Sequence, residues 1–546
     1  MKRLLFLLLA IQLSFSTAVV NSLDGRDVVS TIYYAAYTND DIVFVTPVYS
    51  EGTVYGKTGS GKDVLLVQSA DNVIITGMKN ELENKGNTVE VITSEDPYET
   101  NLLLAERSGA KKFILVDPVY GYNTVSVLAY AKLNSMYLIF VDKNNLDSVM
   151  GFFESNNPSD ILIYGYIDSE VKNSLDENRI LYREINNGDK YDDNMEIADM
   201  YFEQNPSKQQ VVVSDGNSFD DTIAEGNDPV VFISQLVPLS VYNYMKEKAV
   251  SGQIQVAMVV DQEYAPAVYD MKESINHEVG EEVLHVIVKL GEGTDTSGAG
   301  MEQVPLFPLP GPVLGLTIKS AEYNTLSKEL EITYENTGNA PEYVRSQILV
   351  FVDGNYASTV GDDEPFALGR SEKLGIGYPV EIEEGSITVN ITSFYGSSKK
   401  SVEHGIQTIM SAGRVEFSDE SLLEVSEFSD DQEDLYVTFT NGGNVVLYFK
   451  PDVTVDVEGK TTKIEDENIY TLTAGESRII KFPAIAKPDS DVTAGADYGA
   501  REAFLEKRVE NTYTPGSGIE FDMNLLYIIV IIILIVIVVY LFKKKK

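Results

Sequence analysis

A glycine-rich loop near the N-terminus, YGKTGSGKDVLL at residues 55–66, contains the residue types that bind phosphate. Gly56 to Lys62 has the spacing G-x-x-x-x-G-K-[ST], in which backbone N–H groups surround phosphates, Lys contacts them and a hydroxyl holds Mg²⁺. Asp63 occupies the hydroxyl position, and Val64–Val67 is typical of a strand, whereas a phosphate loop leads into a helix. We therefore expect a loop between two strands and no nucleotide.

The two ends of the chain predict export and a membrane anchor. Residues 1–18 combine basic residues, an apolar stretch and small residues, as in a secretory signal peptide cut after Ala18. Residues 523–542 are uncharged and mostly Ile, Val and Leu, which is about the length of one transmembrane helix. The lysines at 543–546 predict a cytoplasmic tail. We expect a single-pass cell-membrane protein with an extracellular N-terminal part and a cytoplasmic C-terminus.

Composition limits the partners and the chemistry. The chain has 84 acidic and 42 basic residues, so its formal net charge of −42 repels nucleic acid and anionic lipid. It has no cysteine, which excludes disulfides and thiol chemistry. No zinc signature, nucleophile elbow or glycine-rich strand-to-helix turn occurs, so we expect no enzyme. We expect no cofactor, with calcium at acidic clusters such as Asp362-Asp363-Glu364 left open.

Internal repeats organise the first half of the chain. An apolar strand followed by a turn recurs three times, at residues 43–54, 114–125 and, more faintly, 211–223. A run with helical spacing precedes each copy, at 27–37, 98–109 and 191–204. Strands that alternate with helices predict parallel sheets with helices on both faces. We expect three Rossmann-like α/β units, at about 24–93, 94–184 and 185–295.

Short motifs in these units resemble the signatures of the cell-wall-binding repeat 2 family. Asp96-Pro97-Tyr98-Glu99-Thr100-Asn101, with Ala105 beyond it, resembles the family's "dRY-x-TA…A" signature, and Asp189-Lys190-Tyr191 repeats it. Gly216-Asn217-Ser218-Phe219-Asp220-Asp221 resembles the block "G-x-N-F-x-DA", which is blurred at Gly121-Tyr122-Asn123-Thr124. The start of the chain after residue 26 is similar, more weakly, to some archaeal surface-layer proteins.

The resemblance implies a surface-layer or wall-anchoring protein that binds anionic wall polymers through clefts between its units. It implies these candidate polymer-binding residues: Tyr98, Thr100, Tyr122, Tyr191, Phe219 and Asp221. Two departures weigh against a polyanion, because Pro97 and Lys190 replace the signature arginine and the net charge is negative unless cations bridge. An alternative reading makes Tyr98, Tyr191 and Phe219 simple core aromatics.

The second half of the chain predicts β modules. A Pro-rich linker at 296–313, with four prolines in its last eleven residues, predicts a semi-rigid spacer. Alternating strands and Asn/Gly turns, Asn336-Thr337-Gly338-Asn339 and later Asn441-Gly442-Gly443-Asn444, recur beyond it. They predict two immunoglobulin-like β-sandwiches at 314–410 and 411–512, similar to adhesion-type modules, and a flexible linker at 513–522.

These features together predict a multidomain surface protein: three α/β units, two sandwiches and one transmembrane helix. We expect the α/β head to bind a cell-envelope polymer or glycan and so link the membrane to the coat. The alternative is a structural surface-layer lattice or stalk protein that associates with neighbouring subunits. Asn390, in the chain's only N-x-[ST] triplet, is a candidate glycosylation site.

Overall fold

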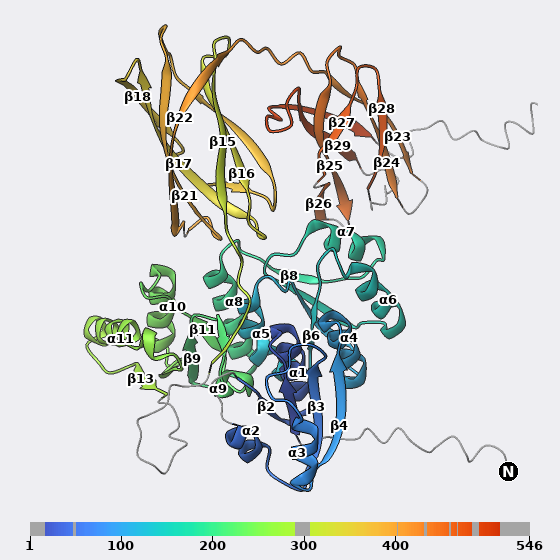
Figure 1. The fold of residues 1–546 in the computed structure, drawn as a ribbon, viewed down its shortest axis with the longest axis vertical. Coiled ribbons are helices and arrows are strands. Elements are labelled where there is room, and N and C mark those ends of the chain that lie inside the picture. The colour runs from blue at the N-terminus through green and yellow to red at the C-terminus, as the bar shows by residue number, and fades with distance from the viewer. Residues whose placement is uncertain are drawn as a thin grey trace, which may run out of the picture. The chain divides into compact units, whose positions relative to one another are not determined.

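The computed structural model describes residues 17–513 apart from 47–50, 290–305, 401, 431–433, 458–459, 467 and 483–490. The chain divides into two compact regions. The first contains residues up to 175 and 179–417, and the second contains 176–178 and the residues from 418 onward. The first region holds the α/β head and one β module, and the second holds the other β module (Figure 1).

Three parallel four-stranded sheets form the head, which confirms the predicted α/β units. All three have the same order, in which the first strand lies between the second and the third: β2-β1-β3-β4, β6-β5-β7-β8 and β11-β9-β12-β13. The strands are β1 Thr17–Asn21, β2 Asp41–Phe44, β3 Asp63–Ser69, β4 Thr88–Ser94, β5 Lys112–Val116, β6 Tyr137–Phe140, β7 Asp160–Tyr164, β8 Arg183–Ile185, β9 Gln210–Ser214, β11 Val230–Phe232, β12 Val256–Val259 and β13 His285–Val288.

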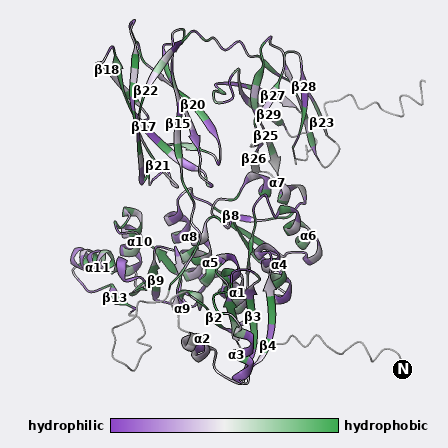
Figure 2. Ribbon diagram, in the orientation of Figure 1, coloured by the Kyte–Doolittle hydropathy of each residue, from purple (hydrophilic) through white to green (hydrophobic). Residues whose placement is uncertain are grey.

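Helices connect these strands. They are α1 Gly25–Thr38, α2 Glu51–Thr58, α3 Met78–Asn84, α4 Pro97–Ser108, α5 Gly121–Asn134, α6 Leu146–Asn156, α7 Ser169–Glu177, α8 Lys190–Gln204, α9 Asp221–Ala224, α10 Leu239–Val250 and α11 Ala265–Val279, with a 3₁₀ turn at Gln262–Tyr264. The inner strands are continuously apolar, as expected for parallel sheets covered on both faces (Figure 2).

The first repeat begins earlier than its sequence suggests. Strand β1 occupies in the first sheet the inner position that β5 and β9 occupy in the others, whereas the predicted copy at 43–54 contributes the edge strand β2. Thr17 and Ala18 are fully buried in β1, so a cut after Ala18 would remove two residues of a central strand. The first unit therefore starts at Thr17 rather than at about residue 24.

The glycine-rich loop at 55–66 has a different setting from the one predicted. It joins α2 to β3, so a helix precedes it and a strand follows it, the reverse of a phosphate-binding loop. Gly59 and Gly61 adopt φ of 75° and 70° at this turn. The Lys62 ammonium lies 2.9 Å from an Asp41 carboxylate oxygen, and Lys57 pairs with Asp221. Both lysines thus serve ion pairs within the head.

The Pro-rich linker is part of the head rather than a spacer. Its described portion contains β14, Phe307–Pro308, which pairs antiparallel with β10, Ser218–Phe219. Phe307 is 2% exposed and meets Phe44 of β2 edge-to-face, with ring centroids 6.4 Å apart. Residues 290–305 lie outside the described part of the chain.

The two β modules are confirmed as β-rich, sandwich-like domains, each with its own core. The first contains β15 Leu316–Asn324, β16 Glu329–Asn336, β17 Glu342–Val352, β18 Asn355–Gly361, β19 Phe366–Leu368, β20 Lys373–Pro379, β21 Ile387–Gly396 and β22 His404–Val415. The second contains β23 Leu423–Asp430, β24 Leu435–Asn441, β25 Leu447–Val457, β26 Lys460–Glu465, β27 Tyr470–Leu472, β28 Ser477–Phe482, β29 Val492–Gly499 and β30 Lys507–Tyr513. The predicted boundary at 410/411 falls inside β22, so the modules divide after Phe417.

The recurring asparagine turn has the same hydrogen bonds in both modules. Asn336 donates to the carbonyls of Ala340 and Leu368 and accepts from the Gly338 N–H at 2.8 Å. Asn441 makes the corresponding three bonds, with Val445, Leu472 and the Gly443 N–H. One buried side chain therefore ties a turn to a second strand in each module, which explains why the motif repeats.

One part of the expected fold class and of the expected location is corrected. No helix within the described residues is long and apolar enough to cross a membrane. The predicted span at 523–542, the lysines at 543–546, the linker end at 514–522 and residues 1–16 lie outside those residues. The part of the chain that the structure describes thus contains no transmembrane helix, which corrects the expected single-pass architecture.

Candidate functional site

The six candidate polymer-binding residues lie in pairs at the three contacts between α/β units. We call these contacts the first interface, where α1 and α4 pack on β6, the second interface, where α5 and α8 pack on β11, and the third interface, where α9 and Phe307 face β2. Tyr98 and Thr100 belong to the first, Tyr122 and Tyr191 to the second, and Phe219 and Asp221 to the third.

The first two interfaces share one hydrogen-bonding pattern. Asn101 of α4 donates to Ser30 of α1 and to the Leu138 carbonyl of β6, and it accepts from the Phe140 N–H. In the second interface Asn194 of α8 makes the matching bonds to Ser126 of α5, the Val230 carbonyl and the Phe232 N–H. Each buried amide fixes two helices to the edge strand of the next sheet, so the two interfaces are structural equivalents.

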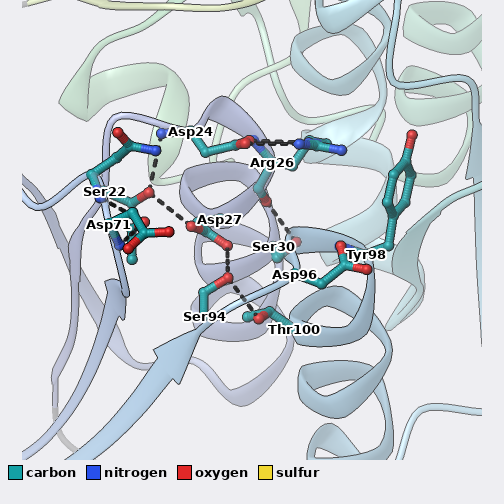
Figure 3. Close-up of polar contacts among 12 residues, drawn as sticks. Ser22, Asp24, Arg26, Asp27, Ser30, Asp71, Ser94, Asp96, Tyr98 and Thr100 are labelled. Atoms are coloured by element: carbon teal, nitrogen blue, oxygen red, sulfur yellow. Dashed lines mark hydrogen bonds and ion pairs between the residues drawn. The ribbon is translucent and has the colours of Figure 1, made fainter.

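At the first interface a buried carboxylate organises the N-terminal end of α1. Asp27, which is fully buried, accepts from Ser22 at 2.7 Å and from Ser94 at 2.6 Å, and burial raises its pKa (Figure 3). Thr100 donates to Ser94 at 2.8 Å and is 4% exposed. The Thr100 hydroxyl is therefore used inside the protein, and its observed role is to hold α4 against α1 rather than to face a ligand.

Tyr98 and Arg26 form the exposed part of the same interface. The Arg26 guanidinium lies 4.7 Å from the centre of the Tyr98 ring, and it binds the Asp24 carboxylate through two nitrogens, at 3.1 and 2.8 Å. Tyr98 donates its hydroxyl to Asp142 at 2.6 Å. Hydrogen bonding to Asp24 raises the pKa of Arg26, while burial raises that of Tyr98. Both side chains are thus held in place before any ligand arrives.

A cleft of about 320 Å³ opens beside this pair, and we call it the first-interface cleft. Its lining comes from the N-terminal ends of α1, α4 and α6: Arg26, Asp96, Tyr98, Glu99, Leu102, Asn144, Asn145 and Ser148. The volume is in the range of small-molecule sites in proteins. An aromatic ring, an aliphatic side chain and several amide, hydroxyl and carboxylate groups converge there.

The second interface carries the same kinds of residue, but another part of the chain covers it. Lys190 of α8 lies 5.5 Å from the centre of the Tyr122 ring and 5.1 Å from that of Tyr191. The cation of the first interface lies on α1 and its ring on α4, whereas here the cation lies on α8, the equivalent of α4, and the Tyr122 ring lies on α5, the equivalent of α1. Burial lowers the pKa of Lys190. Ser398 of the first sandwich donates to Asp189 at 2.5 Å, and Lys400 pairs with Asp192. Tyr122 and Tyr191 are 8% and 5% exposed, which places both in the core.

The third interface is closed by the Pro-rich segment. Phe219 is fully buried and pairs in register with Phe307. Asp221, about one-third exposed, forms its ion pair with Lys57, while Lys289 binds the buried Asp220 at 2.7 Å. Of the six candidates, only Tyr98 lines the cleft. The core-aromatic alternative, which named Tyr98, Tyr191 and Phe219, describes Tyr191 and Phe219, and Tyr122 is buried as well.

Sequence reasoning missed Arg26 and Asn144, which face Tyr98 from other elements. Arg26 follows β1, whose residues had been assigned in part to the signal peptide, and Asn144 lies in the short turn before α6. Aligning β1 with β5 could have found Arg26, because Arg26 then holds the same position in the first unit as the candidate Tyr122 holds in the second. No sequence signal pointed to Asn144.

The remaining predicted sites are located as follows. Asn390 lies in β21, is half-buried, and accepts a hydrogen bond from Gln407 at 2.9 Å. Asp362 accepts from the Ser346 N–H and from the Tyr378 hydroxyl, so part of the acidic cluster at 362–364 serves the fold. Within the described residues no group of three or more His, Cys, Asp or Glu could hold a metal ion.

Comparison with known proteins gives structural likeness only. No family model matches the chain, and no curated protein matches it. Cwp8 from Clostridium difficile is 16% identical over 48% of this chain and 47% of its own, with a TM-score of 0.39. Cwp6 from the same organism is 14% identical over 52% and 42%, with a TM-score of 0.35. The E. coli chaperone DraB is 13% identical over 37% and 96%, with a TM-score of 0.13.

The chain spans less than half the length of the two Clostridium difficile proteins. At these TM-scores the likeness carries no argument about a ligand, so the site has to be judged on its own geometry.

Proposed function

We propose that this protein is a non-catalytic cell-surface protein whose α/β head binds a polymer or glycan of the cell envelope at the first-interface cleft. The observation that carries the proposal is the contrast among the three interfaces. The second is covered by the first sandwich, the third is closed by Phe307, and the first has an open cleft beside a preset aromatic ring.

The chemistry of the lining suits a sugar. A pyranose presents C–H groups on its faces and hydroxyls around its edge. Tyr98 and Leu102 offer apolar surface for such a face, while Asn144, Ser148 and Glu99 offer donors and acceptors for the hydroxyls. The Tyr98 ring is held by Asp142 and Arg26, so little side-chain entropy is lost when a ligand binds it.

Co-sedimentation with isolated cell envelopes tests the proposal. We expect the purified protein to sediment with intact envelopes and to stay in solution once glycans and polymers have been stripped. Asn144→Trp places a large ring at the exposed rim of the cleft and should abolish sedimentation. Lys143→Trp is the matched control, because Lys143 is an exposed neighbour outside the cleft lining. Equal binding of stripped and intact envelopes would contradict the proposal.

A second candidate function is self-association in a surface lattice. It is favoured by two exposed leucines three positions apart in the third unit, Leu236 at 86% and Leu239 at 73% exposure. Exposed apolar residues that gather in one place often mark contact surfaces. Sedimentation velocity of the purified protein, alone and with calcium, would show oligomers that Leu236→Ser/Leu239→Ser removes. A monomer at all concentrations would exclude this candidate.

A further inference from the structure

The first-interface cleft has an excess of negative charge. Among its lining residues one is cationic, Arg26, and two are anionic, Asp96 and Glu99. Two more carboxylates lie directly behind the lining, since Asp24 binds Arg26 and Asp142 binds Tyr98. An approaching ligand therefore meets a lining with two carboxylates and a single guanidinium.

The guanidinium is already paired with an anion of the protein, which weakens it as a counterion for an anionic ligand. It makes a two-nitrogen contact with Asp24, the geometry in which arginine binds carboxylates most strongly. Its flat face lies over the Tyr98 ring. A phosphate or carboxylate of a ligand would therefore meet a guanidinium whose charge Asp24 already offsets.

The two carboxylates of the lining face the cleft without cationic partners. Asp96 caps α4 by accepting from the Tyr98 N–H at 2.9 Å, and Glu99 is exposed in the first turn of the same helix. Among the described residues neither forms an ion pair. Carboxylates in this position accept hydrogen bonds from sugar hydroxyls, and they repel phosphate and uronate groups.

We propose that the first-interface cleft takes an uncharged, hydroxyl-rich glycan segment and excludes the anionic wall polymers that the sequence resemblance implies. This inference rests on the proposed function and names the ligand class of that site. Recognition then comes from hydrogen bonds to carboxylates and amides and from stacking on Tyr98. The net charge of −42 acts in the same direction, because it lowers the concentration of polyanions near the surface.

Binding of the full-length purified protein to separated glycans tests the proposal. The probes are the uncharged and the anionic glycan fractions of isolated envelopes, divided on an anion exchanger, and poly(glycerol phosphate). We expect the uncharged fraction to bind at least about tenfold more tightly than either polyanion. Its affinity should change less than about twofold between about 50 and 500 mM NaCl, because no phosphate contacts are screened.

A charge-neutral variant separates electrostatics from shape. Asp96→Asn/Glu99→Gln keeps a capping side chain at the start of α4 and removes both lining charges. It should strengthen binding of poly(glycerol phosphate) by about tenfold or more while changing binding of the uncharged fraction by less. Glu95→Gln is the control, since Glu95 is exposed beside Asp96 but does not line the cleft.

Two results would overturn the inference, and they have different consequences for the proposed function. If the anionic fraction binds more tightly and Asn144→Trp abolishes this binding, the site is correct and the ligand class is wrong. If neither fraction binds, the proposed function fails and the ligand class fails with it.

Discussion

Replacing Arg370 with methionine should destabilise the first compact region strongly at neutral pH. Arg370 lies between β19 and β20 of the first sandwich, and it donates to Asp117 at 3.0 Å and lies 3.6 Å from Asp168. The two carboxylates follow β5 and β7, where the connections of the second sheet diverge. Their side chains are only 1% and 6% exposed.

The magnitude follows from the burial of these charges. Removing one partner of a buried ion pair costs about 3–5 kcal/mol, because the remaining charges stay buried without compensation. In the intact protein burial already raises the pKa of Asp117 to about 6 from 3.8. A raised carboxyl pKa stabilises the fold most at low pH, and this contribution, about 3 kcal/mol, is lost as the pH rises through about 6. Because the Arg370 charge lowers the pKa of Asp117, Arg370→Met should raise it further. The loss should therefore be larger at pH 8, where Asp117 is forced to stay ionised, than at pH 5, where it can take up a proton.

Differential scanning calorimetry at the two pH values would measure this, since it resolves the transitions of separate regions. Arg345→Met is the control, because Arg345 is an exposed arginine of the same sandwich, and we expect it to cost less than about 0.5 kcal/mol. Asp117→Asn/Asp168→Asn in the Arg370→Met background should restore most of the stability. A small, pH-independent loss in Arg370→Met would refute the reasoning.

Three further predictions concern stability. Burial raises the pKa of Glu342 to about 7, so the folded protein loses stability as the pH rises through 7 and the buried carboxyl ionises. Glu342→Gln should therefore stabilise the fold by up to about 3 kcal/mol at pH 8 but hardly at pH 5. Equal shifts of the urea midpoint at the two pH values would contradict this. Phe307→Ala should cost about 3–5 kcal/mol in thermal unfolding, since the ring closes the third interface, whereas a true spacer residue would cost nothing measurable. Asn441→Ala removes three hydrogen bonds of a buried side chain and should destabilise the second module by about 2–4 kcal/mol while leaving the calorimetric transition of the first region in place.

Local patterns predicted the elements of the head well, because apolar runs and helical spacing reflect burial of each element by itself. The predicted runs at 27–37, 98–109 and 191–204 became α1, α4 and α8. The predicted fold class was wrong in its transmembrane helix, since no helix among the described residues is long and apolar enough to cross a membrane. The P-loop-like segment was misread at its start, since Gly, Lys and Thr residues gave no apolar period for α2.

Properties that depend on distant residues were harder to predict. Strand β1 was missed because a short apolar run with small residues has the same composition in a signal peptide and in a central strand. The Pro-rich segment was read as a spacer, since its composition sets its extended backbone but does not reveal that Phe307 meets Phe44. Tyr98 was found because it lies in a motif, whereas the cleft beside it needs Arg26 and Asn144, which tertiary folding alone brings there.

The three interfaces differ because other segments of the chain pack on two of them. Asp96 and Asp189 are equivalent helix caps, yet Asp96 is exposed and Asp189 is buried under Ser398 of the first sandwich. The Pro-rich segment closes the third interface in the same way, through Phe307. Among the described residues of the three interfaces, the first presents an open cleft, and the sandwich that covers the second is held to the head by Arg370. Under the proposed function each chain contributes one binding cleft, so avidity for a long glycan has to come from several chains rather than from the three units of one chain.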